Sequence, residues 1–81
     1  MDYDNDKVDE ATLALLFLGL TRSPTGGRAW KTFDLKTLER LHRKGWIAAP
    51  KLRDVTLEFT PAGAAKAEAL FREHFQTRRN A

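Results

Sequence analysis

Apolar residues recur along the first part of the chain with the spacing of a helix over about residues 7–20. At ~100° per residue they fall into two groups on opposite faces of that helix. One group is Leu13, Leu16, Phe17 and Leu20, and the other is Val8, Ala11, Leu15 and Leu18. Asn5 or Asp6 is the expected N-cap, because a short side-chain acceptor binds the free N–H groups of the first turn. Since a surface helix needs only one apolar stripe, the second face predicts a further contact.

The next segment, residues 21–33, is predicted to be an arm. Pro24, Gly26 and Gly27 interrupt any helix there. Within the arm, residues 28–31 are expected to pair briefly as an edge strand.

A second helix is predicted over residues 35–44, and both of its ends are marked. Asp34 is the N-cap, and Gly45 follows the helix where a left-handed backbone favours glycine. Trp46 is then placed to pack back on Leu41, as in a Schellman end.

The rest of the chain predicts a hairpin and a closing helix. Residues 46–48 form a short first strand, residues 49–54 the turn, and residues 55–59 a strand that alternates apolar and polar positions. Thr60 caps the last helix and Pro61 starts it, because proline gives up an N–H that has no partner at that position. The apolar face of this helix is Ala67, Leu70, Phe71, His74 and Phe75.

This order predicts an α+β fold of the reduced winged-helix type: helix, arm with a short strand, helix, two-stranded hairpin, helix. Residues 1–6 are an acidic head expected to be flexible, residues 7–75 the domain, and residues 76–81 a basic frayed tail. The predicted core is Leu13, Leu16, Phe17, Leu20, Leu38, Leu41, Ile47, Leu57, Phe59, Leu70 and Phe71.

Two stretches carry a family resemblance. Residues 38–47, a short hairpin and then Phe59-Thr60-Pro61-Ala62-Gly63 resemble the recognition helix, wing and closing helix of bacterial winged-helix regulators. Over its whole length, the chain also resembles a family of small bacterial proteins of unknown function, through Met1-Asp2-Tyr3-Asp4, the apolar first helix and Arg28-Ala29-Trp30-Lys31. One departure is that the arm stands where a helix-turn-helix has its first helix.

Charge is distributed unevenly along the chain. Residues 1–10 hold five carboxylates and one lysine, a charge of −4, so the remaining residues carry +7 within the net charge of +3. A basic body suits anionic partners such as nucleic acid. The candidate contacts are Lys36, Arg40, Arg43 and Lys44, opposite the leucines of the second helix, with Lys51 and Arg53 near the hairpin tip. The alternative is an ordinary solvated face.

The composition offers little to a catalyst. There is no cysteine, Ser23 is the single serine, and His42 and His74 are expected to be half-buried packing residues. We therefore expect no enzyme, no metal, no cofactor and no small-molecule ligand. The longest apolar run is about half of the ~20 residues that span a bilayer, and the expected location is the cytoplasm.

Two functions remain open. The first is a DNA-associated regulator that binds the duplex backbone through the basic helix and wing. The second is a protein-interaction module that forms a homodimer through Val8, Ala11, Leu15 and Leu18, unless the closing helix and the arm cover that face within one chain. Of the two tryptophans, Trp46 is expected in the core, whereas Trp30 is either a lid on that core or a stacking surface for unpaired bases.

Overall fold

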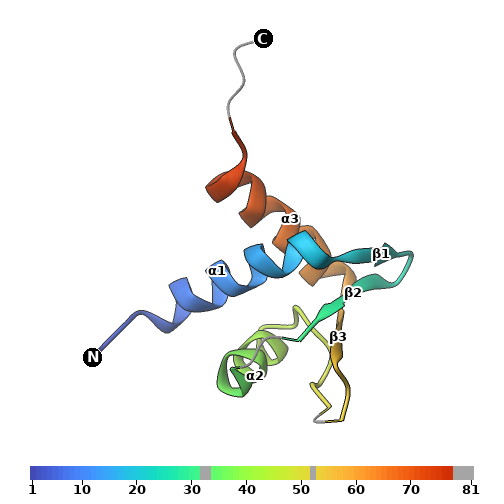
Figure 1. The fold of residues 1–81 in the computed structure, drawn as a ribbon, viewed down its shortest axis with the longest axis horizontal. Coiled ribbons are helices and arrows are strands. Elements are labelled where there is room, and N and C mark those ends of the chain that lie inside the picture. Colours follow the sequence, from blue (N-terminus) through green and yellow to red (C-terminus); the bar gives the residue numbers. More distant parts are fainter. Residues whose placement is uncertain (32–33, 52, 78–81) are drawn as a thin grey trace.

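The α+β class is confirmed by the computed structural model, which describes residues 1–31, 34–51 and 53–77. Its elements are α1 (Asn5–Leu16), the short 3-10 helix η1 (Phe17–Gly19), β1 (Thr21–Ser23), β2 (Gly26–Trp30), α2 (Leu35–Arg43), β3 (Thr56–Phe59) and α3 (Pro61–Phe75). Figure 1 shows α1 crossing the middle of the molecule, with α2 on one side, α3 on the other and the sheet where α1 ends. Residues 32, 33, 52 and 78–81, which belong to the expected arm, turn and tail, lie outside the described residues.

Helix α1 begins earlier than its sequence predicts. The N-cap is Asp4, whose Oδ1 accepts hydrogen bonds from the backbone N–H groups of Asp6 at 2.9 Å and Lys7 at 3.2 Å. The prediction of Asn5 or Asp6 as the cap is therefore wrong, because Asp4 has the extended backbone that a cap requires. Residues 5 and 6 consequently belong to the folded unit and not to a free acidic head.

The sheet is antiparallel in the order β1-β2-β3, so β2 is its central strand. The expectation of an edge strand in this segment is wrong, because the expected arm folds into a β1–β2 hairpin whose second strand also pairs with β3. Gly26 makes this pairing possible, since its φ is 136° and a Cβ there would collide with the backbone of Phe59.

The predicted two-stranded hairpin is formed only in part. Ile47 makes an isolated bridge to Phe59, and Ala48 N–H donates to the carbonyl of Glu58 at 2.9 Å. Pro50 has no N–H with which to continue the ladder, and the long partner of β3 is β2.

The C-terminal end of α2 and the start of α3 follow the sequence prediction. Asp34 does occupy the N-cap position of α2, but its side chain makes no capping hydrogen bond to the backbone. Gly45, with a φ of 79°, donates to the carbonyl of His42, and Trp46 N–H donates to that of Leu41 at 3.1 Å. These two bonds define a Schellman end. At the start of α3, Thr60 Oγ1 accepts from the N–H of Gly63 at 2.9 Å.

The predicted core is confirmed. The buried members are Leu13, Leu16, Leu38, Leu41, Ile47, Leu57, Phe59 and Leu70. Phe17, Leu20 and Phe71 are partly buried and pack against them. Among the described residues, two polar side chains are also buried, those of Asp9 and Thr37, and both lie where α1 meets α2.

Candidate functional site: a basic surface and an apolar face

A buried carboxylate joins α1 to α2. Asp9 is completely buried, and its Oδ1 accepts a hydrogen bond from Nε of Arg40 at 2.7 Å. Its Oδ2 accepts one from Nζ of Lys44 at 2.8 Å, and the same ammonium reaches Asp6 at 2.9 Å. Because a buried charge is tolerated only when it is paired, Arg40 and Lys44 hold Asp9 in the fold.

The side chain of Arg40 is largely buried inside the protein. This side chain is only 18% exposed, and its Nη2 donates a hydrogen bond to Oγ1 of Thr37 at 3.0 Å. The buried hydroxyl of Thr37 in turn donates to the carboxylate of Asp34. Arg40, expected to contact nucleic acid, therefore has a structural role in this network.

Lys44 is held in the same way. Burial on its own lowers the pKa of the ammonium, but hydrogen bonds and charge interactions with Asp9 and Asp6 outweigh that effect, so the pKa lies above its ordinary value. Nζ also lies 5.3 Å from the centre of the Trp46 ring. Lys44 remains charged, but its charge is directed at α1.

The other four predicted cations face solvent. These are Lys36, Arg43, Lys51 and Arg53. Across residues 1–31, 34–51 and 53–77, no ion pair involves any of them. Glu39 and Asp54 are exposed on the same segments and dilute the positive charge. The six predicted contacts therefore divide into four exposed cations and two that stabilise the fold.

The role of Asp9 was missed, although the sequence holds a signal for it. Asp9 is four residues before Leu13 and seven before Leu16, so it falls on the apolar stripe that faces the core. A carboxylate on such a stripe requires cations from a neighbouring element, and α2 is the most basic helix.

The second apolar face predicted for the first helix, which runs along α1 and into η1, is largely exposed. Leu15 is 53% exposed, Leu18 is 70% exposed and Ala11 also faces solvent, whereas Val8 is half-buried. Helix α3 packs against α1 but leaves these leucines uncovered. Near the end of α3, Phe75 is 47% exposed and lines a hollow together with Lys7, Glu10, Ala11 and His74.

The histidines do not have the half-buried packing role that was predicted. His42 and His74 are both exposed. His42 lies at the edge of the buried face of α2, whereas His74 lies in the last turn of α3, past the buried Ala67 and Leu70. Nδ1 of His42 is 3.0 Å from the carbonyl oxygen of Ile47. Among the described residues, no group of three or more histidine, cysteine or acidic side chains could hold a metal ion.

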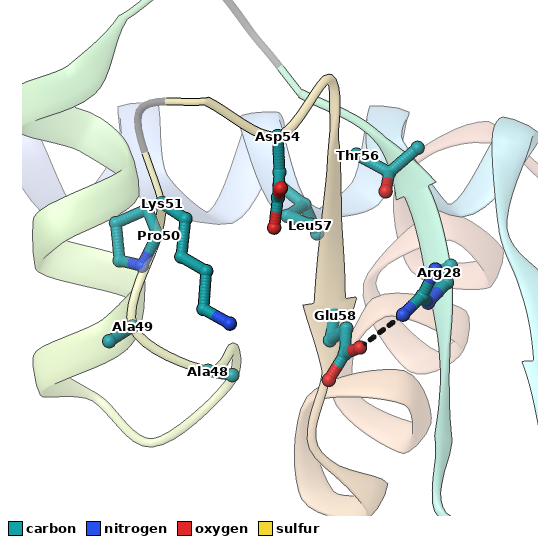
Figure 2. Close-up of a pocket in the computed structure, with 9 residues that line it drawn as sticks. All are labelled: Arg28, Ala48, Ala49, Pro50, Lys51, Asp54, Thr56, Leu57 and Glu58. Carbon is teal, nitrogen blue, oxygen red and sulfur yellow. Dashed lines mark hydrogen bonds and ion pairs between the residues drawn. The ribbon is translucent and has the colours of Figure 1, made fainter.

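The two tryptophans have different surroundings. Trp46 is half-buried, with the ammonium groups of Lys44 and Lys66 over its ring at 5.3 and 5.8 Å. Trp30, at the end of β2, is 69% exposed. Close to it along the sheet, a hollow of about 300 Å³ opens between residues 48–51 and β3 (Figure 2).

In the part of the chain that the structure describes, no helix has the length and apolar character needed to cross a membrane.

Comparison with known proteins gives two matches. A family model described as "Domain of unknown function (DUF6429)" matches residues 4–77. The chain is also similar to "Uncharacterized protein y4hR" of Sinorhizobium fredii (strain NBRC 101917 / NGR234), with 43% identity over 75 residues. That match covers 93% of this chain and 97% of the relative. No solved structure matches.

Proposed function

The chain belongs to the DUF6429 family, which is described without an activity, and we propose its function from its own geometry. The proposal is a non-enzymatic protein that binds nucleic acid, with duplex DNA as the reference ligand, through contacts with the phosphate backbone. The observation that carries it is the exposure of four cations on α2 and the loop after it: Lys36, Arg43, Lys51 and Arg53.

The order of elements supports the same proposal. Helix α2, the bridge at Ile47, β3 and α3 follow one another as the recognition helix, wing and closing helix do in the winged-helix regulators that the sequence resembles. A β-hairpin, not a helix, precedes α2. We therefore propose contacts with phosphates and not insertion into a groove, and such contacts carry no sequence information by themselves.

The test is a fluorescence-anisotropy titration of labelled duplex DNA at several salt concentrations. If four phosphates are neutralised, the logarithm of the association constant falls against the logarithm of salt with a slope of about −3.6. Lys36→Ala/Arg43→Ala should reduce the steepness of that slope by about half, because each phosphate contact contributes about 0.9.

The matched control is Lys7→Ala/Arg72→Ala, which removes the same charge from exposed positions on α1 and α3. This control should retain most of the slope. The proposal fails if the wild type does not bind at low salt, or if the two double variants lose affinity equally.

A second candidate, a protein-interaction module that forms a homodimer, is favoured by the exposure of Leu15, Leu18 and Phe75. The chain exposes 6111 Å² for a mass of 9.2 kDa. Folded monomers of that mass expose about 4,900 Å². Part of the excess comes from the first four residues, which precede α1 and are exposed. Burying each leucine stabilises by about 1.5–3 kcal/mol, against an association cost of about 4–15 kcal/mol.

Light scattering over a concentration series tests this second candidate. Leu15→Asp/Leu18→Asp should give a folded monomer where the wild type is a dimer. Val55→Asp is the control, because Val55 is 65% exposed on the sheet side of the molecule. If the wild type stays monomeric at high micromolar concentration, the homodimer proposal is wrong.

A further inference from the structure

The open side of the sheet carries an exposed tryptophan. Trp30 is 69% exposed, although tryptophan has one of the largest apolar surfaces of any side chain. Strand alternation explains its direction: Ala29 is buried, whereas Arg28 and Trp30 are exposed on the opposite face of β2. Across the strand pair, Thr56 lies opposite Trp30 and Glu58 opposite Arg28. The indole therefore stands on the face of the sheet that the helices do not cover.

Cations surround this part of the sheet. Arg28 is two residues along the same face from Trp30, and it shares the hollow in Figure 2 with Lys51, whose side chain extends into that hollow. Lys31 ties the end of β2 to the loop, because its Nζ donates to the backbone carbonyl of Lys51 and its N–H to that of Val55 at 2.9 Å. The loop also holds Arg53, which is exposed.

The acidic groups of this surface do not cancel the cations. Arg28 pairs with Glu58 at 2.6 Å, but both side chains are more than half exposed. An exposed ion pair of this kind contributes little, so a phosphate can compete for the guanidinium. Asp54 is the other carboxylate lining the hollow.

We propose that Trp30 is a stacking platform for an unpaired base of single-stranded nucleic acid, with Lys51, Arg53 and Arg28 holding the adjacent phosphates. This inference rests on the proposed nucleic-acid function and names its substrate class. An aromatic side chain among cations suits a single strand, because every base has a face that can stack and the backbone supplies the charge. In a duplex the base faces are already stacked on their neighbours, and the indole gains nothing from them.

The experiment compares a short oligothymidine with a duplex of equal length by fluorescence anisotropy at low salt, using the full chain. The single strand should bind more tightly. Trp30→Ala should weaken single-strand binding by about 5- to 140-fold, the range expected for the loss of one base–aromatic stack. Duplex affinity should change less than twofold, and Trp30→Phe should recover most of the single-strand affinity.

Intrinsic fluorescence gives a second readout. Trp46→Phe leaves Trp30 as the single tryptophan of the chain. Its emission should be quenched when oligothymidine is added, because the indole stacks on a base, and unchanged when the duplex is added. Urea unfolding of each variant shows that it is folded, which is expected at Trp30 because the side chain is mostly exposed.

The outcomes separate this inference from the proposed function. Binding to neither strand form at low salt overturns both. A second outcome is that duplex binding depends on Lys36 and Arg43 while Trp30→Ala leaves single-strand affinity unchanged. This result supports the proposed function and overturns this inference. Loss of single-strand affinity in Trp30→Ala together with quenching of Trp30 supports it.

Discussion

Two pairs of cations, on α2 and its C-cap Lys44, have different roles. Arg40 and Lys44 hold the buried carboxylate of Asp9, whereas Lys36 and Arg43 extend into solvent. Around an ideal helix, the first two lie within ~40° of each other and the second two within ~20°. The difference teaches that the cations of a basic stripe do not all belong to one exposed surface. Those at the edge that lies against α1 form ion pairs inside the fold.

The largest effect should come from Asp9→Ala. Removing this carboxylate leaves two cations with restricted access to water and without their buried partner, and breaking a buried ion pair costs about 3–5 kcal/mol. Urea unfolding measures the change in free energy of unfolding. Asp2→Ala removes the same charge from an exposed position before α1 and should stay within about 0.5 kcal/mol of the wild type. A loss below about 1 kcal/mol for Asp9→Ala would contradict the structural role of the network.

A triple replacement sharpens the comparison. Asp9→Val with Arg40→Met and Lys44→Met removes all three charges while keeping the summed side-chain volume similar. Because the cost of burying the ions disappears with them, the free energy of unfolding should lie within about 1 kcal/mol of the wild type or above it. Nucleic-acid affinity should be retained, since Lys36 and Arg43 are untouched. A triple variant as unstable as Asp9→Ala would show that the three charges specify the packing of α1 on α2.

The smallest expected effect is the pH dependence of the stability that Lys44 contributes. The pKa of Lys44 is raised in the folded chain, so its charge interactions stabilise the fold fully below the ordinary value of 10.5 and are lost as pH rises through the folded value. The stability difference between wild type and Lys44→Met should therefore be constant near neutral pH and shrink above 10.5. Urea unfolding across this range measures it, with Lys36→Met as the exposed control. An unchanged difference at high pH would contradict the ion pairing.

Local chemistry made much of the fold predictable from the sequence. The end of α2 at Gly45 and the start of α3 at Thr60 and Pro61 depend on hydrogen bonds within a few residues, and both are as predicted. The strand that pairs with β3 was not predicted correctly, because an alternating pattern identifies a strand but does not identify the strand beside it. The nearest segment was expected, but Pro50 stops that ladder and the glycine-bearing β2 can approach closely.

The sequence predicted which kinds of residue form the candidate site, but not which individual residues belong to it. Helical spacing identified both the second apolar face of α1 and the basic stripe of α2. Which cations of the stripe are free depends on a carboxylate more than thirty residues away, at Asp9. The exposure of Leu15 and Leu18 likewise depends on how α3 crosses α1, and no local pattern fixes that crossing.

The most direct test of the division between the two pairs is one matched substitution made twice on α2. Arg40→Gln and Arg43→Gln change the same side chain three residues apart, and both urea unfolding and duplex anisotropy are measured for each. Arg40→Gln should cost about 1.5–3 kcal/mol of stability, because it removes a charged hydrogen bond to Asp9, and should leave the salt slope unchanged. Arg43→Gln should leave stability within about 0.5 kcal/mol and make the slope shallower by about 0.9. Equal effects of the two variants on stability and on affinity would contradict the account.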